Sequence, residues 1–490
     1  MARKLLLLGL CLGVAACTVG PDFQAPPPPK AESYTGAPLT DTVGVTVAGG
    51  AAQHFAPGAD IPGQWWLLFH SEALDGLVRQ AIKDSPNLQA AQAALRAAME
   101  NVKAQMGNYY PSVTAGLDAS RNRNAAQISP TLTSAALLYS LYQTQLSVSW
   151  SPDLWGGNRR QVEALQAEAD SQRFQLQAAY VGLTANIVAA AIQEASLRAQ
   201  IDATHALIAD EQQILEIEEH QHSLGQIAGA DIAAQQVVLA QMQQTLPPLE
   251  KQLAQNRDLL IALGGHLPAD DAPPDLDLAA LKLPEDIPVS LPSKLVEQRP
   301  DVRAAEENLH MASAEIGVSI AARLPNITLS ADAGTVATEL GQLSAPGNQF
   351  WSIGAGLTQP LFDGGTLAHR TQAARDTYDQ VAAQYRGTVV TAFQNVADAL
   401  HAVQSDSDNL NAAEAADAAA SRSLAIARKL VSLGQTSGLG LLTAEQAQQQ
   451  TRLAVIQAQA SRLSDTAALF AALGGGWWNQ PDVEVHLAKP

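Results

Sequence analysis

The side chains that could do chemistry do not gather into a reactive set. His220 and His222 form a His-x-His pair, a spacing that can bring two imidazoles to one metal ion, but no further ligands follow at metal-binding spacing. Gly156-Gly157 and Gly364-Gly365 lack the Lys-Ser/Thr that completes a phosphate-binding loop. Serine, histidine and aspartate are plentiful, yet no nucleophile-elbow motif occurs. We therefore expect no enzymatic activity, no metal and no cofactor, and a solvated His pair.

Covalent modification is predicted at one residue, Cys17. Residues 1–16 combine Arg3 and Lys4 with an apolar stretch of about ten residues, which is typical of a signal peptide and too short to cross a bilayer. Val14-Ala15-Ala16-Cys17 resembles the lipobox of bacterial lipoproteins. That resemblance implies S-diacylglycerol and N-palmitoyl groups on Cys17, which would anchor the chain at the outer membrane. The alternative is an ordinary signal peptide with an incidental cysteine.

Composition limits the class of protein. The 490 residues carry 29 basic and 48 acidic side chains, a net charge of −19, which argues against a nucleic-acid partner. Only 2 cysteines and 34 glycines exclude a disulfide scaffold and a collagen. A hydrophobic content of 47% argues against wholesale disorder. Abundant alanine, glutamine and leucine favour long helices.

The chain contains an internal duplication. Pro86 and Pro300 begin similar helical stretches 214 positions apart, and Pro111 and Pro325 end them with the same offset. The Leu-Gly-Gln triplets at 224–226 and 433–435 are 209 positions apart. Such a period is far longer than that of solenoid repeats, so each half must be a large structural unit.

Four segments alternate apolar and polar residues with a period of two, the pattern of strands that bury one face. In the first, apolar Val113 and Leu117 alternate with polar Thr114 and Asp118. The expected strands are 112–121, 143–151, 326–336 and 349–359. Each has the length that a tilted strand needs to cross a bilayer. No later stretch shows the continuous apolar run of a transmembrane helix, so any crossing must use these strands.

Long helical hairpins are expected at 158–263 and 367–473. Residues 158–223 contain no proline and would make about 100 Å of helix. Two apolar tracks at seven-residue spacing predict a coiled-coil seam, and Glu194 interrupts the first of them. The first track comprises Tyr180, Ile187, Ile201, Ile208 and Leu215, and the second comprises Leu176, Leu183, Ala190 and Leu197. Each long helix should stop at its Leu-Gly-Gln triplet. We expect Pro247-Pro248 to break the first returning helix, because two prolines remove helical hydrogen bonds.

Four strands cannot close a barrel by themselves, and an open sheet edge cannot face lipid. Several copies of the chain must therefore join, and three copies would supply twelve strands. The long helices would pack side by side below them. Polar strand faces would then line a wet lumen, while apolar faces would contact lipid.

These features resemble the TolC-like outer membrane factors, and specifically the NodT-type outer membrane lipoproteins of RND efflux systems. The motifs that carry the resemblance are Cys17–Phe23 (CTVGPDF), Trp65-Trp66 with Phe69, Arg299–Glu306 (RPDVRAAE) and Ala472–Trp477 (ALGGGW). The resemblance implies a mixed α and β membrane protein, a homotrimer with a twelve-stranded outer membrane β-barrel continuous with a periplasmic α-helical barrel. It also implies a periplasmic adaptor and an inner membrane RND-type pump as partners.

The resemblance further suggests which residues carry function. The expected adaptor-contacting tips are Leu224, Gly225 and Gln226 in the first half and Leu433, Gly434 and Gln435 in the second. The expected pore aperture comprises Asp231, Leu439, Leu442 and Thr443. Relatives often carry acidic residues where this chain has Gly440 and Thr443, so closure by leucine packing is expected instead of closure by salt bridges. Asp231 could equally be a helix cap.

The resulting organisation is a signal peptide (1–16), a lipidated tether (17–64), a first repeat (65–270), a linker (271–298), a second repeat (299–478) and a tail (479–490). The expected function is the outer membrane channel of a tripartite efflux system, passing small molecules from the pump and adaptor. Two alternatives remain, a duct for protein or peptide secretion and a periplasmic coiled-coil adaptor without a pore. The four amphipathic segments argue against the second alternative.

Overall fold

The computed structural model describes residues 18–47, 49–125, 138–269, 274–433, 435 and 438–480. The chain folds as two compact units built from separate stretches of sequence. Unit 1 comprises Met1–Pro26, Ala94–Gln172 and Ala304–Tyr385, and unit 2 comprises Pro27–Ala93, Arg173–Arg303 and Arg386–Pro490. Each unit therefore draws on both halves of the sequence.

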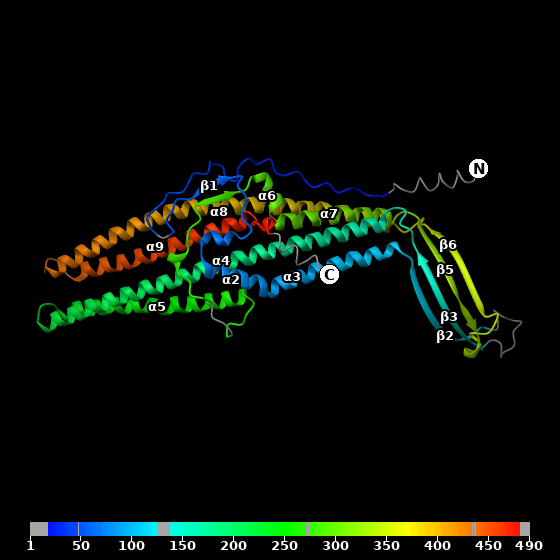
Figure 1. Ribbon diagram of the computed structural model, residues 1–490, viewed down its shortest axis with the longest axis horizontal. Helices are drawn as coiled ribbons and strands as arrows, with labels where there is room; N and C mark the ends of the chain where they lie inside the picture. The colour runs from blue at the N-terminus through cyan, green and yellow to red at the C-terminus, as the bar shows by residue number, and fades with distance from the viewer. Residues whose placement is uncertain are drawn as a thin grey trace. The chain divides into compact units, whose positions relative to one another are not determined.

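Unit 1 contains a four-stranded antiparallel sheet in the order β2-β3-β5-β6 (Figure 1). The strands are β2 (Ser112–Arg123), β3 (Leu138–Trp150), β5 (Asn326–Ala337) and β6 (Gln349–Thr358). β3 begins before the expected residue 143, because Leu138 and Tyr139 suit a strand although they break the alternation. Within the described residues, β2 and β6 each pair with a strand on one side only.

The two faces of this sheet differ in polarity. One row across all four strands is apolar and consists of Val113, Val148, Ala331 and Ile353. The next row is polar and consists of Thr114, Ser147, Asp332 and Ser352. The Ser147 and Ser352 hydroxyls donate to the Asp332 carboxylate at 2.6 and 3.2 Å. The register thus aligns the alternation of every strand and produces one apolar and one hydrogen-bonded face.

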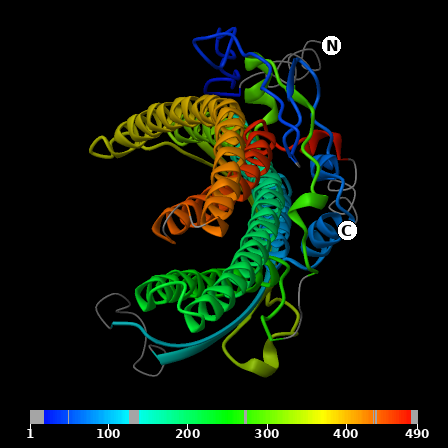
Figure 2. The same ribbon diagram turned by 90° about the vertical axis from the view of Figure 1, so that its left-hand side faces the viewer.

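Two helical hairpins of equal length follow the two strand pairs. Helices α4 (Gly157–Ser223) and α8 (Thr366–Ser432) each have 67 residues, and α5 (Gly229–Leu263) and α9 (Gly438–Ala472) each have 35. Figure 2 shows α4 paired with α5 and α8 paired with α9. Matching lengths in the two halves are what a duplicated unit would produce.

The expected break at Pro247-Pro248 is wrong, because α5 continues through both prolines. The prolines remove two amide donors, but the helix is held by its packing. Leu246 packs against the cluster formed by Ile208, Val238 and Met242 of the α4–α5 hairpin. Tertiary packing of this kind commonly outweighs local helix propensity.

The seam of α4 is buried along its heptad tracks. Leu176, Leu183 and Leu197 are at most 9% exposed. Glu194, which interrupts the other track, is fully buried and accepts from the Arg198 Nε at 2.7 Å and from the Leu276 amide at 3.2 Å. One 18-residue window of α4 is apolar enough to cross a membrane, but 56% of it is buried in protein, as in the core helix of a soluble domain.

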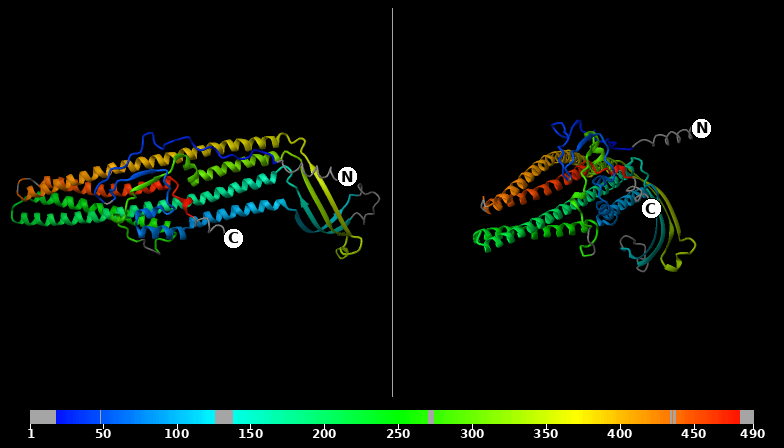
Figure 3. Two further views of the ribbon diagram at one scale, coloured as in Figure 1. Left: turned by 45° about the horizontal axis from the view of Figure 1, so that its top comes forward. Right: turned by 60° about the vertical axis from the view of Figure 1, so that its left-hand side comes forward.

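The part of the expected tether after residue 26 belongs to unit 2 and packs along it. β1 (His54–Pro57) pairs in parallel with β4 (Asp286–Val289), which lies in the expected linker. Gln53 is fully buried, and its side-chain amide donates to the Pro284 carbonyl at 3.0 Å and to the Thr466 hydroxyl at 3.1 Å. Figure 3 shows the N-terminal segment running beside α8, where Gln404 donates to the Thr40 carbonyl at 3.2 Å.

The remaining elements are short or complete the helical layers. They are the helices α2 (Glu72–Asp84), α3 (Pro86–Met106), α6 (Pro292–Gln298) and α7 (Pro300–Ala321), with 3-10 turns at Trp65–Phe69, Gly107–Tyr109, Leu278–Ala280, Leu340–Gln342 and Trp477–Asn479. Trp65 is fully buried and stacks on Phe470 with ring centroids 5.5 Å apart. The Trp65-Trp66 motif is therefore part of the packed interior of unit 2.

Candidate functional site: hairpin turns, buried carboxylates and the N-terminal motif

The α4–α5 turn ends α4 with a Schellman motif. Gly225 has φ +77°, the left-handed conformation that glycine adopts without strain. Its amide donates to the His222 carbonyl at 2.8 Å, and the Gln226 amide donates to the Gln221 carbonyl at 2.9 Å. Leu224 is 60% exposed. The Leu-Gly-Gln triplet thus terminates the helix and presents its leucine to solvent.

One hydrogen bond of this kind recurs at the end of α8. The Gln435 amide donates to the Leu430 carbonyl at 2.9 Å, the bond that corresponds to the one made by Gln226. Leu433 is 56% exposed, and Gly434 lies outside the described residues. Figure 1 shows both turns at the same end of unit 2. Among the described residues, each helix end thus exposes a leucine next to a Gln amide that bonds back to the helix.

Asp231 stabilises the start of α5. Its carboxylate accepts a hydrogen bond from the Ala228 amide at 3.2 Å, which satisfies one of the unpaired donors at the helix N-terminus. The Asp231 carboxylate also affects Glu218, which lies near the end of α4. Burial and the nearby Asp231 charge raise the pKa of Glu218. Asp231 is therefore a capping residue of α5.

The other expected aperture residues lie at the start of α9. Leu442 packs against the α4–α5 cluster, and its neighbour Leu441 is 4% exposed and packs with Leu424 of α8. Thr443 is exposed. The side chain of Leu439 lies outside the described residues. Leucine packing at this end of α9 thus connects the two hairpins of one chain.

A buried carboxylate cluster lies near the turns, and the sequence analysis did not single it out as a site. The side-chain amide of Gln235 in α5 donates to Glu211 in α4. Burial, together with the neighbouring Glu445 carboxylate of α9, raises the pKa of Glu211 to about 8. Burial also raises the pKa of Glu445 to about 7, against the opposing charge of Arg428. Three helices therefore meet at carboxylates that hold protons near neutral pH.

The signal for this cluster was present in the sequence. The seven-residue track through Leu176, Leu183 and Leu197 continues to Thr204, Glu211 and Glu218. All of these residues are at most 9% exposed. Extending the heptad past its last leucine would have placed both glutamates in the seam.

The motif that follows Cys17 is held tightly in unit 1. Arg160 of α4 is 3% exposed and donates to the Val19 carbonyl at 3.1 Å and to the Asp22 carboxylate at 2.6 Å. Phe23 stacks on His310 of α7 with ring centroids 4.4 Å apart. Cys17 itself lies outside the described residues. The Val-Gly-Pro-Asp-Phe motif therefore fixes the residues after Cys17 to two helices.

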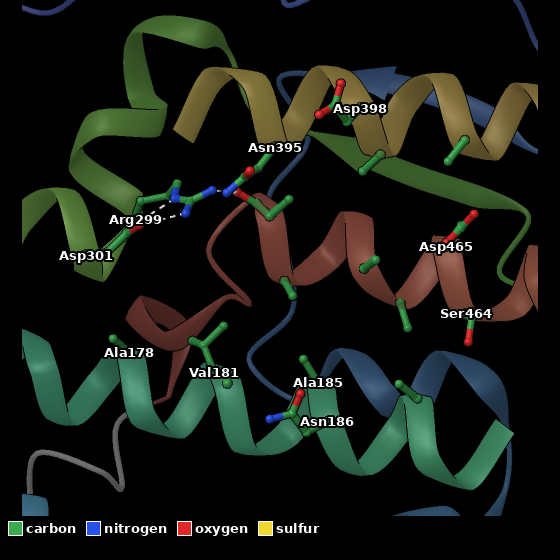
Figure 4. Close-up of a pocket in the computed structure, with 18 of the residues that line it drawn as sticks. Ala178, Val181, Ala185, Asn186, Arg299, Asp301, Asn395, Asp398, Ser464 and Asp465 are labelled. Carbon is green, nitrogen blue, oxygen red and sulfur yellow. Dashed lines mark hydrogen bonds and ion pairs between the residues drawn. The ribbon is translucent and has the colours of Figure 1, made fainter. Parts of the chain in front are cut away.

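The Arg-Pro-Asp motif joins the start of α7 to the end of α9. Arg299 donates to the Asp301 carboxylate at 2.9 and 2.6 Å and to the Ala472 carbonyl at 3.0 Å. Figure 4 shows this pair beside a groove of about 690 Å³, in which alanines predominate and which Asp398 and Asp465 also line. Because the Arg299 guanidinium donates to Asp301 and to the Ala472 carbonyl, we interpret its role as structural.

The described residues contain no group of three or more His, Cys, Asp or Glu side chains that could hold a metal ion. His220 and His222 are both exposed in the last turn of α4.

Comparison with known proteins identifies the family. The family described as "Outer membrane efflux protein" matches residues 77–266 and 291–475. The chain is 28% identical over 484 residues to the antibiotic efflux pump outer membrane protein ArpC of Pseudomonas putida, covering 98% of this chain and 97% of the relative. It is 30% identical over 490 residues to the outer membrane protein OprJ of Pseudomonas aeruginosa, with coverage of 98% and 97%.

Solved structures agree with this assignment. The outer-membrane channel OprN superposes with a TM-score of 0.80 at 25% identity, covering 94% of this chain and 100% of that chain. The chain therefore belongs to the outer membrane efflux protein family and is the outer membrane channel component of an efflux pump, a transporter without enzymatic activity.

Proposed function

We propose that three copies of this chain form a twelve-stranded outer membrane β-barrel continuous with a periplasmic α-helical barrel. The observation that carries the proposal is the sheet of unit 1, whose two faces differ in polarity and whose β2 and β6 edges lack a partner in the described chain. Open edges are not stable in lipid, so strands of neighbouring copies must pair with them. Twelve strands fall in the range of known barrels.

The expected cargo is a small molecule. The relatives named above include an antibiotic efflux protein, and others are a toluene efflux protein and a pyoverdine export protein of Pseudomonas putida. We infer that this chain likewise passes small molecules, delivered by an inner membrane RND-type pump through a periplasmic adaptor. The exposed turns around Leu224 and Leu433 are the surfaces that the adaptor would contact.

Lipidation of Cys17 fits the position of the residues that follow it. Thr18 is held where the connection after β3 leads into α4: the Arg159 guanidinium donates to its hydroxyl at 2.8 Å, and the Val19 amide donates to the Trp155 carbonyl at 3.1 Å. Acyl chains on Cys17 would therefore start beside the junction of the sheet with α4. A Cys17→Ala variant should lose incorporation of a palmitate analogue, whereas a Cys11→Ala variant should keep it.

The aperture proposal concerns Asp231 together with Leu439, Leu442 and Thr443. Asp231→Ala removes the hydrogen bond to the Ala228 amide and should loosen the turn, raising single-channel conductance in planar bilayers. Asp231→Asn keeps an acceptor oxygen and should remain close to the unaltered protein. Unchanged conductance in the alanine variant would remove Asp231 from the aperture.

Chemical cross-linking in native outer membranes tests the assembly. The cross-linked ladder should end at three subunits, because three chains complete the barrel. A ladder that continues beyond three, or a monomer that resists cross-linking, would refute the trimer. A matched strain that lacks the chain should also accumulate more of a fluorescent efflux substrate, which tests transport separately from assembly.

A further inference from the structure

The two connections that lead from the sheet of unit 1 into the long helices differ in exposure, although the duplication makes them counterparts. Residues 152–157 (PDLWGG) follow β3, and residues 360–365 (PLFDGG) follow β6. Leu361 and Phe362 are 94% and 93% exposed, whereas Leu154, the counterpart of Phe362, is half-buried. Covering two adjacent large apolar side chains of this kind is favourable, and the described part of the chain does not cover them.

The connection after β3 is covered by the end of α7. The Trp155 indole nitrogen donates to the Pro325 carbonyl at 2.7 Å. Leu154 and Leu324 line one cleft of about 640 Å³, which lies where β3 and β5 meet the helices. The connection that leaves one strand thus packs against the helix end that precedes the neighbouring strand.

The end of α3 is the counterpart of the end of α7, but it is less covered. Pro111 follows α3 as Pro325 follows α7, so Tyr110 corresponds to Leu324. Tyr110 is 73% exposed, whereas Leu324 is half-buried. Met106, in the last turn of α3, is 42% exposed. The first half of the chain therefore exposes an apolar helix end whose counterpart in the second half is covered.

The strand order brings the two exposed surfaces together between copies. β6 leads into α8 as β3 leads into α4, and β2 follows α3 as β5 follows α7. Pairing of β6 with β2 of the next copy therefore repeats the antiparallel pairing of β3 with β5 within one chain. Such pairing places the connection after β6 against the end of α3 of the next copy.

We propose that Leu361 and Phe362 of one copy dock on the end of α3 of the next copy, on the surface formed by Met106 and Tyr110. This contact rests on the trimer of the proposed function and names the side chains that join its copies where the sheet meets the helices. Phe362 lies beside Tyr110 of the next copy as Leu154 lies in one cleft with Leu324. Each copy gives one contact and receives one, so three copies close the ring.

Disulfide trapping in native outer membranes tests the contact. Phe362→Cys combined with Tyr110→Cys should yield disulfide-linked dimers and trimers on mild oxidation, and neither single variant should. Phe362→Cys combined with Leu340→Cys is the matched control, because Leu340 is 61% exposed and lies between β5 and β6, beyond the opposite ends of these strands. This control pair should give no product larger than its two single variants give.

Amine cross-linking of the same membranes separates this contact from the trimer. A ladder that ends at three subunits without the Phe362–Tyr110 disulfide would overturn the contact and leave the trimer intact. Absence of both products would overturn the contact and the trimer together.

A photoreactive benzoylphenylalanine in place of Phe362 distinguishes a second copy from lipid. It should join two chains on irradiation, and the adduct should map to the end of α3. Adducts formed with phospholipid alone would overturn the docking contact, since the exposed side chains would then face the bilayer.

A charge swap tests the pairing of the two side chains. Phe362→Lys should lower the yield of trimer about tenfold, because it removes an apolar contact without disturbing a buried side chain of its own chain. Adding Tyr110→Asp should recover about two- to fivefold of that loss, the range expected for an exposed ion pair. Trimer yield that is the same in Phe362→Lys as in the unaltered protein would overturn the proposal.

Discussion

At the residue scale, the buried carboxylates of unit 2 show how a polar group can occupy a helical seam. Glu211 is 2% exposed and accepts from Gln235, and its raised pKa keeps it protonated near neutral pH. Burying a neutral carboxylic acid costs far less free energy than burying a carboxylate. Protonation is therefore what allows three helices to pack at this point.

The stability of the helical region should consequently depend on pH. The folded-state pKa of Glu211, about 8, lies above that of an unfolded chain, so the folded state binds the proton more tightly. Stability is fully present below the unfolded pKa, near 4.5, and falls as pH rises toward 8, by up to about 1 kcal/mol per pH unit. The melting temperature of the solubilised protein should therefore fall between pH 5 and pH 8.

Glu211→Gln provides the control for this dependence. It keeps an oxygen that accepts from Gln235 and cannot ionise, so its melting temperature should change less with pH and exceed that of the unaltered protein at pH 8. Glu250→Gln, at an exposed position of α5, should leave the pH dependence unchanged. Parallel curves for the unaltered chain and Glu211→Gln would rule out Glu211 as the source.

The N-terminal motif depends on the absence of a side chain. Gly20 has φ +98°, and a Cβ built there would lie 2.4 Å from the Cα of Gly317 in α7. Gly20→Ala should therefore destabilise unit 1 by about 2 kcal/mol or detach residues 18–26 from it. Gly76→Ala in α2, where a Cβ meets no atom within 4 Å, should be neutral or slightly stabilising. Limited proteolysis measures this difference: the N-terminal segment should be cleaved faster in Gly20→Ala than in Gly76→Ala.

Individual residues were the hardest feature to predict. The pairing of Arg160 with Asp22 joins residues 138 positions apart, and nothing in local spacing reports such a contact. The meeting of Glu211 with Glu445 likewise depends on how two distant hairpins pack. Glycine and capping positions were easier to predict, because the end of α4 at Gly225 depends on local backbone geometry alone.

At the element scale, each hairpin turn combines a local stop signal with an exposed leucine. If the proposed adaptor contacts these tips, Leu224→Asp together with Leu433→Asp should weaken its co-purification at least about tenfold, because both apolar side chains become charged. Thermal stability should stay the same, since both side chains are more than half exposed. Leu259→Asp, at a similarly exposed leucine of α5 away from the turns, is the matched control. Adaptor binding that survives the double change would place the contact elsewhere.

Helices and strands were largely readable from the sequence, and the exceptions have physical causes. Proline-free runs indicated α4 and α8, and period-two alternation indicated the four strands of unit 1. α5 persisted through Pro247-Pro248 because Leu246 and its neighbours pack against α4. β1 and β4 are four residues each and pair across more than 200 positions, so neither carries a local pattern long enough to detect.

At the scale of the whole molecule, the duplication supplies two strand pairs and two hairpins, and the sheet has one apolar face that the described part of the chain leaves uncovered. Trp351, Ile353 and Leu357 of β6 are 76%, 78% and 68% exposed. So large a run of exposed apolar side chains is unfavourable in water and supports the barrel proposed above, in which this face contacts lipid. The neighbouring polar face, centred on Asp332, requires water.

A lysine should therefore impair assembly when it is placed on the apolar face but not when it is placed on the polar face. Ile353→Lys places an ammonium on the apolar row and should reduce assembled channel in the outer membrane, at a cost of about 2–4 kcal/mol near the bilayer centre. Ser352→Lys, the adjacent residue on the polar row, places the same charge beside Asp332 and should assemble normally. Quantifying cross-linked trimer in outer membrane fractions compares them. Equal assembly of the two variants would mean that the apolar row does not face lipid, and the sheet would then need another explanation for its uncovered face.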